Sequence, residues 1–597
     1  VFFLTLSQKH KKSPELFYEQ GSVLFEIGAE KNCIKTLRKS AHYFKQATVM
    51  QPSHVEAWHG WGCALALIGR KEDLLDAKEK MEKAVALAPH VPELHWDTAL
   101  IYLNLSDHSG EIDDIFNALS HFAKCEDKIS YFEFWNSYGN GYIRLSEQLD
   151  DIRPVLKAVS CFKQAIALSL NNADGWLGLA RSLQKLYRYS HENDHYNQAC
   201  DCFAAAIQLL PQRREIALER IAFIIETALR TKETSKLRVA IDKCEQASSS
   251  PHLLGYYSVA LTFLGAWTGR VELLHEAEEK INRALENDSD SDDPLLIFLS
   301  GQSFFALAEY HRDLDLYYQA VEEFQASLSL DRSQLACWVW MGHTYSAVYE
   351  LTDDVTYLER ALHFYSKSLQ IKNDPHLYFE IASLLIELGD NSHTTEPIQQ
   401  AISYLEYLFQ TYKAISFDHP EWFYHYGIAL NKLGDFNEES TLLHKALEAF
   451  INVLMFNPAH PKIHHRIGIV YSHLGDILTD SDYLYRSLHH FKLASKSQEE
   501  DEALLIDWGL ALLCLGEEGY REAEAKFMQA ALLGSQEVYY HLACLYSLQG
   551  AFDLSITYLQ KSHASKNLPP IDEIMDDEWL DSLRLTPQFQ EFLALLK

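Results

Sequence analysis

The 597-residue sequence lacks features on which several classes of protein depend. Its ten cysteines show no paired spacing, which argues against a disulfide framework and favours a reducing compartment. No window approaches the ~18 consecutive apolar residues of a membrane span. The apolar start, Val1 to Leu6, is short and is soon followed by Lys9, so no signal peptide is expected. We therefore expect a cytoplasmic protein that does not insert into a membrane.

Basic charge is also scarce. The chain has 52 Lys and Arg against 84 Asp and Glu, a net charge of -32, which repels phosphate backbones and disfavours nucleic acid as a partner. The sequence contains no phosphate-binding glycine loop, no G-x-S-x-G motif and no strand pattern that could hold one. We expect no enzymatic activity, no cofactor and no metal site.

Two short strings resemble metal sites without meeting their requirements. His191 to His195 reads H-E-x-x-H, which binds zinc only on an unbroken helix, and the repeat described below places a helix start at Asp194. Asp288 to Asp292 resembles the start of a calcium loop, but Leu299 stands where that loop needs Glu. An inter-helix turn and a solvated linker are the favoured interpretations.

One helical signature recurs about fourteen times at a spacing near forty residues and accounts for almost the whole chain. A clear copy has Trp338, Met341, Gly342 and Tyr345, followed by Ala361 and Tyr365. A small residue ends the first half of nearly every copy and lets two helices approach closely. The small residues are Gly21, Gly62, Ala99, Gly139, Ala180, Ser258, Gly301, Gly342, Ala382, Gly427, Gly468, Gly509 and Ala543, and Ile221 is the exception.

The order W-x2-L-G-x2-Y, then A-x3-F-x2-A, then P resembles the tetratricopeptide repeat, a helix-turn-helix unit. The resemblance implies an all-α fold, a right-handed superhelical solenoid of about 14 stacked repeats with a C-terminal helical cap. In most copies the small residue and the first Ala of the second half lie nineteen residues apart, as in Gly342 to Ala361, where the standard unit has twelve. We interpret the extra residues as a longer first helix, similar to the repeats of kinesin light chains and Pins-type adaptors.

The repeat also predicts helix starts and domains. A capping residue stands five positions before that Ala in several copies, as in Asp194 and Asp315. We expect repeats 1 to 6 in 1–250, repeats 7 to 10 in 251–408 and repeats 11 to 14 in 409–566. The acidic and amphipathic residues 567–597 form either a cap over the last repeat or a docking tail for a partner.

In this family the first helices line a concave groove that binds peptides or partner helices, so the groove residues can be read from the repeat. With the small residue as position eight, position two is acidic in six successive repeats: Glu15, Glu56, Glu93, Glu133, Asp174 and Glu215. This acidic stripe either attracts a basic segment of a partner or only stabilises the helix starts through the macrodipole.

Other groove positions are polar or aromatic. Asn136, Asn140 and Arg181 are expected to lie side by side, either to bind a peptide backbone or as an exposed polar face. Aromatic groove positions, suited to anchoring partner side chains, are Trp96, Phe298, Phe379, Tyr424, His465 and Tyr540. The Lys and Asn clamp of chaperone-binding relatives is missing, because His59 and Cys63 stand at its positions in the second repeat.

The sequence therefore predicts a non-enzymatic scaffold or adaptor that binds protein or peptide partners in the groove of a tetratricopeptide superhelix. The alternative is a chaperone or targeting factor that holds a client protein for secretion or assembly.

Overall fold

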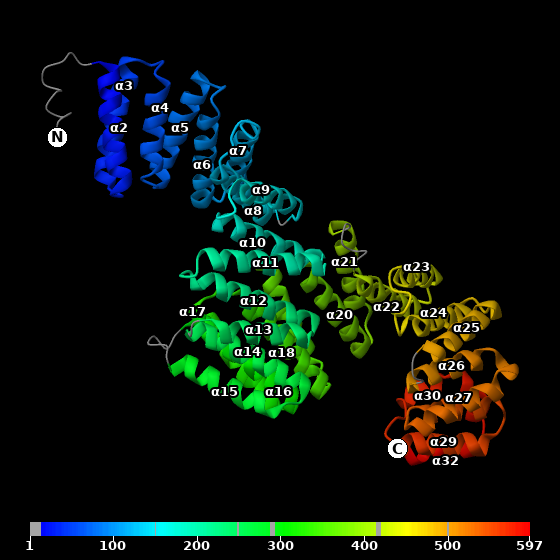
Figure 1. Ribbon diagram of the computed structural model, residues 1–597. Coiled ribbons are helices and arrows are strands. Elements are labelled where there is room, and N and C mark those ends of the chain that lie inside the picture. The colour runs from blue at the N-terminus through cyan, green and yellow to red at the C-terminus, as the bar shows by residue number, and fades with distance from the viewer. Residues whose placement is uncertain are drawn as a thin grey trace. The chain divides into compact units, whose positions relative to one another are not determined.

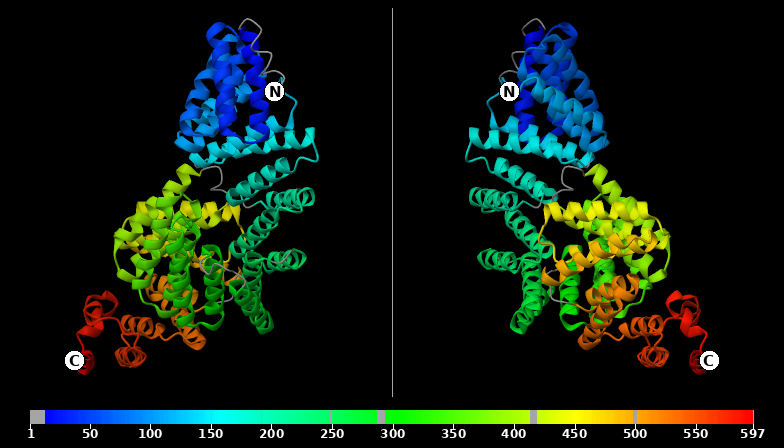
Figure 2. Two further views of the ribbon diagram at one scale, coloured as in Figure 1. Left: turned by 90° about the vertical axis from the view of Figure 1, so that its left-hand side faces the viewer. Right: turned by 90° about the vertical axis from the view of Figure 1, so that its right-hand side faces the viewer.

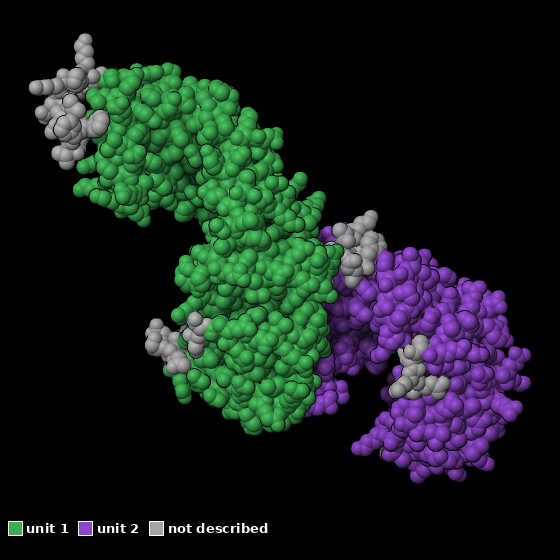
Figure 3. Space-filling view, in the orientation of Figure 1, with its two compact units in different colours: residues 1–311 green, residues 312–597 purple. Residues whose placement is uncertain are grey.

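The computed structural model describes residues 13–149, 151–190, 192–247, 250–286, 293–412, 419–497 and 501–596. Within these ranges every regular element is a helix and no strand occurs. The chain divides into two compact units, residues 1–311 and 312–597 (Figures 1 and 3).

Successive helices of unit 1 are joined by short connections (Figure 1). They are α2 (Pro14–Glu30), α3 (Ile34–Met50), α4 (Val55–Ala66), α5 (Lys71–Leu87), α6 (Pro92–Ser109), α7 (Ile112–Ala123), α8 (Phe132–Leu149), α9 (Arg153–Leu168), α10 (Ala173–Ser190), α11 (Asn193–Leu209), α12 (Arg214–Thr231), α13 (Thr234–Gln246), α14 (Pro251–Thr268), α15 (Val271–Glu286) and α16 (Pro294–His311).

Unit 2 continues the same alternation of helices and ends in shorter elements (Figure 2). They are α17 (Leu314–Leu330), α18 (Leu335–Thr352), α19 (Thr356–Ile371), α20 (Pro375–Ser392), α21 (Thr395–Thr411), α22 (Pro420–Phe436), α23 (Ser440–Phe456), α24 (Ile463–Ile477), α25 (Ser481–Ser497), α26 (Glu502–Cys514), η2 (Gly516–Glu518), α27 (Tyr520–Leu533), α28 (Val538–Leu548), α29 (Phe552–Ala564), α30 (Ile571–Asp576), η3 (Glu578–Leu580), α31 (Asp581–Arg584) and α32 (Pro587–Leu596).

The small residue of most first helices faces an aromatic side chain of the second helix, although Gly62 faces Met81 instead. A Cβ atom added at Gly342 would lie 2.4 Å from the ring of Tyr365, and one added at Gly427 would lie 2.5 Å from the ring of Phe450. At these two positions only glycine permits the helices to approach so closely without a shift of the ring. Taken in chain order, α2 to α29 form fourteen pairs, each made of a first and a second helix. This arrangement confirms the predicted all-α repeat solenoid.

The one exception to the small residue comes with a change in the second helix. Ile221 is 2% exposed in α12, and Cys244 of α13 occupies the repeat position that a larger apolar side chain, in most copies Phe or Tyr, fills elsewhere. A larger side chain on one helix is thus matched by a smaller one on the other, which keeps the core volume of the repeat nearly constant. Cys125, Cys161 and Cys202 are also buried, and all ten cysteines are free thiols.

Hydrogen bonds between paired helices follow the spacing seen in the sequence. Ser40 donates to the Gly21 carbonyl and Ser487 to the Gly468 carbonyl, each nineteen residues away, whereas Ser555 donates to Ala543, twelve residues away. Helix bounds locate the seven extra residues. In the first helices, ten residues of α8 follow Gly139, but only five residues of α28 follow Ala543. In the second helices, five residues of α9 precede Ala158, but only three residues of α29 precede Ser555. The first helix is longer, as expected, and the second helix also begins earlier.

The predicted helix starts were wrong by one or two residues. α17 begins at Leu314 with Asp313 as its N-cap, so Asp315 is already the second helical residue. An acidic side chain is favoured both at the cap and in the first turn, so composition alone does not separate the two positions. α11 likewise begins at Asn193, so Asp194 is not its cap.

The helix break within the H-E-x-x-H string is confirmed. α10 ends at Ser190 and α11 begins at Asn193, so no continuous helix carries the string. His191 itself lies outside the described residues, as does the Asp288 to Asp292 stretch.

The C-terminal residues pack on the last repeat. Ile574, Leu580, Leu583, Phe589 and Phe592 are at most 2% exposed and join the apolar core of α28 and α29. Tyr540 of α28 also donates a hydrogen bond to Asp577, at 2.7 Å. These contacts are those of a cap, which is one of the two alternatives, cap or docking tail, that stay predictions for residues 567–597. The expected domain limits near residues 250 and 409 lie inside the two units and stay predictions.

Candidate functional site

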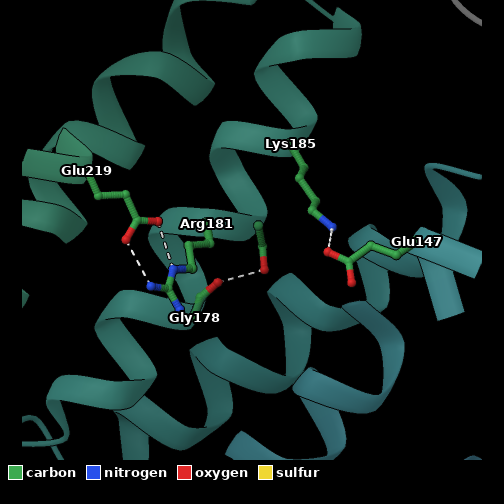
Figure 4. A network of polar contacts seen from close by, with 6 residues as sticks. Glu147, Gly178, Arg181, Lys185 and Glu219 are labelled. Atoms are coloured by element: carbon green, nitrogen blue, oxygen red, sulfur yellow. Dashed lines mark hydrogen bonds and ion pairs between the residues drawn. The ribbon is translucent and has the colours of Figure 1, made fainter. Parts of the chain in front are cut away.

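The first helices carry rows of polar pairs that join each repeat to the next. Counting the small residue as position eight, position sixteen of one repeat pairs with position thirteen of the following one. In Figure 4, Lys185 of α10 reaches Glu147 of α8 at 2.5 Å. The same row contains Asp107 with Arg144, Arg188 with Glu226, Asp390 with Lys432, and Asp435 with His473. In the four pairs of this row that contain Lys or Arg, the opposite charges therefore neutralise one another.

A second row of pairs lies near the middle of the first helices. In each pair the carboxylate stands at position six of the following repeat. Arg181 donates two hydrogen bonds to Glu219, at 2.8 and 2.9 Å, and this pairing raises the pKa of the guanidinium (Figure 4). His59 bonds Asp97 at 2.6 Å, and His465 bonds Asp507 at 2.8 Å. Pairs of this kind link neighbouring first helices. The carboxylates at position six are therefore bonded within the protein.

The acidic stripe lies outside these two rows. Glu15, Glu56, Glu93, Glu133, Asp174 and Glu215 are all exposed, and each is the second residue of its helix in unit 1. Two have a close basic partner, because Glu56 lies 3.0 Å from His54 and Asp174 lies 3.6 Å from Arg213. Glu93, Glu133 and Glu215 form no ion pair within the part of the chain that the structure describes.

The predicted polar group is largely occupied by contacts within the protein. Asn136 exchanges two hydrogen bonds with the buried Asn172, both at 3.1 Å, and Arg181 is held by Glu219. Asn140 is exposed. Sequence reasoning missed Asn172, because it lies before α10 in a loop where helical periodicity gives no position.

The aromatic groove positions are at least partly buried. Tyr424 and His465 are each 7% exposed, and Phe379 packs edge-on against His425 with the ring centres 4.8 Å apart. Trp96 contacts Tyr131 and Phe134, Phe298 is half-buried, and Tyr540 bonds Asp577. These side chains mainly fill space between helices, so they offer a partner less surface than the sequence suggested.

Unit 2 contains a cavity of about 320 Å³ that the sequence did not indicate. Its polar lining comes from α20, α22, α24 and α26, and includes Asp390, Asn431, Lys432, Arg466, His473 and Asp507. Arg466 donates to the Tyr424 hydroxyl at 3.3 Å, and His473 lies 3.2 Å from Asn431. Positions thirteen and sixteen of the repeat, read for opposite charges, would have indicated several of these residues.

Comparison with known families identifies the repeat. Residues 536–562, which contain α28 and most of α29, match the family model of the tetratricopeptide repeat. The match and the fourteen successive helix pairs together support a tetratricopeptide-type repeat architecture, and proteins built from this repeat are generally non-enzymatic scaffolds for protein interaction. No described helix is both long enough and apolar enough to cross a membrane.

Several solved structures resemble the chain. The anaphase-promoting complex hetero-tetramer Cut9-Hcn1 is 14% identical, covering 98% of this chain and 98% of that chain, with a TM-score of 0.35. TTC0263 of Thermus thermophilus is 18% identical over 34% of this chain and 98% of its own, with a TM-score of 0.26. Human IFIT1 is 14% identical over 74% and 90%, with a TM-score of 0.34. No curated protein sequence matches. At these TM-scores the likenesses carry no conclusion about function.

Proposed function

We propose that the protein is a non-enzymatic adaptor that binds a basic segment of a partner protein on the first-helix face of unit 1. The observation that carries the proposal is the contrast between rows of carboxylates on that face. Those at positions six and sixteen are matched by cations in several repeats, as in Glu219 with Arg181 and Glu147 with Lys185. Glu93, Glu133 and Glu215 keep their charges uncompensated.

Stabilisation of the helices does not require this arrangement. A carboxylate in the first turn gains about 0.3 to 1 kcal/mol from the helix dipole whether it stands on a first or a second helix. Second helices α9 and α13 have Pro154 and Ser235 at the same position, whereas six successive first helices of unit 1 have an acid there. This difference supports a binding role for the first-helix face, beyond the stabilisation of its helices.

The electrostatics of the stripe set what it can bind. Exposed charges act over a Debye length of about 8 Å at physiological ionic strength, so a partner must bring Lys or Arg side chains close to the carboxylates. Binding should be fast and should weaken as salt is added. The overall charge of -32 disfavours acidic partners in the same way.

Matched charge reversals test the proposal. The test variant carries Glu56→Lys, Glu93→Lys and Glu133→Lys on the first helices. The control carries Glu72→Lys, Asp113→Lys and Asp194→Lys, which are exposed second residues of the second helices α5, α7 and α11. Both variants change the charge equally and lose the same dipole stabilisation, so they differ only in the face that is altered.

The readout is affinity capture from native lysate followed by mass spectrometry at two salt concentrations. We expect at least one partner, retained by wild type and control and released by salt, to be lost from the test variant. Equal capture by all three proteins would refute the proposal, because the stripe would then serve only its own helices.

A further inference from the structure

The positions where chaperone-binding relatives carry their clamp hold a different set of side chains in the second repeat. His59 and Cys63 lie one turn apart on the same face of α4, and Asp97 of α6 approaches them from the next repeat. One donor atom from each residue lies within 4.8 Å of the other two. All three residues are half-buried, so solvent reaches the cluster.

The same chain contains a natural comparison in unit 2. His465 of α24 and Asp507 of α26 occupy the repeat positions of His59 and Asp97 and form the same hydrogen bond, at 2.8 Å against 2.6 Å. Ile469 stands at the position of Cys63. The His and Asp pair is therefore explained by packing between neighbouring first helices, whereas the thiol of Cys63 has no counterpart in that role.

We propose that His59, Cys63 and Asp97 form a binding site for a divalent transition-metal ion, with zinc as the ion that fits best. An imidazole nitrogen, a thiolate and a carboxylate are the three ligand types that zinc takes in proteins. Three protein ligands leave one tetrahedral position for water or for a donor of a partner. This inference is independent of the proposed acidic stripe.

Binding replaces protons by the ion. The metal needs a neutral imidazole and a thiolate, so any protons that these ligands carry pass to solvent when the ion binds. Affinity therefore rises with pH, and the bound ion links α4 to α6.

The test uses the full-length chain, treated with a chelator and a reducing agent and then titrated with Co²⁺ and with Zn²⁺. We expect one equivalent of Co²⁺ with the near-ultraviolet charge-transfer band of a cobalt thiolate, which Zn²⁺ then displaces. Cys63→Ala should abolish this band and weaken zinc binding at least tenfold. Circular dichroism checks that the variant keeps its helices.

Two variants in unit 2 complete the test. His465→Asn should leave the stoichiometry and the band unchanged. Ile469→Cys recreates the set of three ligands and should bind a second equivalent with the same band. Absence of a thiolate band in wild type, equal zinc affinity in Cys63→Ala, or no added equivalent in Ile469→Cys would each overturn the proposal.

Discussion

Gly342 offers a direct test of how the paired helices are packed. A Cβ atom there would lie 2.4, 2.6 and 2.8 Å from three carbons of the Tyr365 ring, against an ordinary contact of 3.4 to 4 Å. The ring is 1% exposed, and its hydroxyl lies 2.7 Å from Nδ1 of His343, so it cannot turn aside without losing a hydrogen bond. Overpacking of this kind costs roughly 1 to 3 kcal/mol.

The size of the effect depends on the side chain introduced. In Gly342→Ala the better helix propensity of alanine returns about 1 kcal/mol, so we expect a net loss of ~1 kcal/mol. Gly342→Glu adds a carboxylate to the same buried site and should lower the free energy of unfolding by ~4 kcal/mol or more.

Denaturant unfolding, combined with hydrogen exchange read by mass spectrometry, measures the effect and places it. Faster exchange should be concentrated in α18 and α19, because a repeat protein loses structure locally. The matched control is Ala336→Glu, which adds the same carboxylate to the exposed first turn of the same helix and should be neutral or slightly stabilising. Unchanged unfolding of Gly342→Glu would refute the packing described here.

Three further predictions concern other parts of the chain. Phe589→Ala empties a fully buried position of the C-terminal cap and should cost about 3 to 5 kcal/mol, with faster hydrogen exchange in α28 and α29; normal exchange there would contradict the cap. Arg181→Ala removes a half-exposed pair with Glu219 and should change stability by no more than ~1 kcal/mol in denaturant unfolding. Burial, helped by Lys124 and His95, lowers the pKa of His121 to about 4, below its ordinary 6.5, so the unfolded chain binds the proton more strongly. Stability should fall as pH drops from about 6.5 to 4, and His121→Asn should reduce that fall by ~1 kcal/mol in unfolding curves at pH 7 and 5.

The repeat could be predicted because one core contact recurs. The small residue of the first helix and a large apolar residue of the second fit each other in most copies, so Gly139 with Phe162 and Gly468 with Phe491 appear at the same spacing. Helix starts were less predictable, because an acid such as Asp315 is favoured at the cap and inside the first turn alike.

The site was predicted only in outline. The exposed carboxylates of the acidic stripe follow from the repeat, since position two of a first helix faces solvent. The hydrogen bonds between Asn136 and Asn172 could not be predicted, because the loop before α10 has no fixed periodicity. The inter-repeat pairs could have been found, since Glu147 and Lys185 stand at positions that recur with opposite charges.

Site-specific photocrosslinking tests the central claim most directly. A photoreactive amino acid is placed at Asn140 on first helix α8 or at Lys163 on second helix α9, both of which are exposed. The captured partner is then irradiated with each protein. We predict a crosslink from position 140, mapped to a basic segment of the partner, and none from position 163. A crosslink from position 163 alone would contradict the claim that the first helices form the binding face.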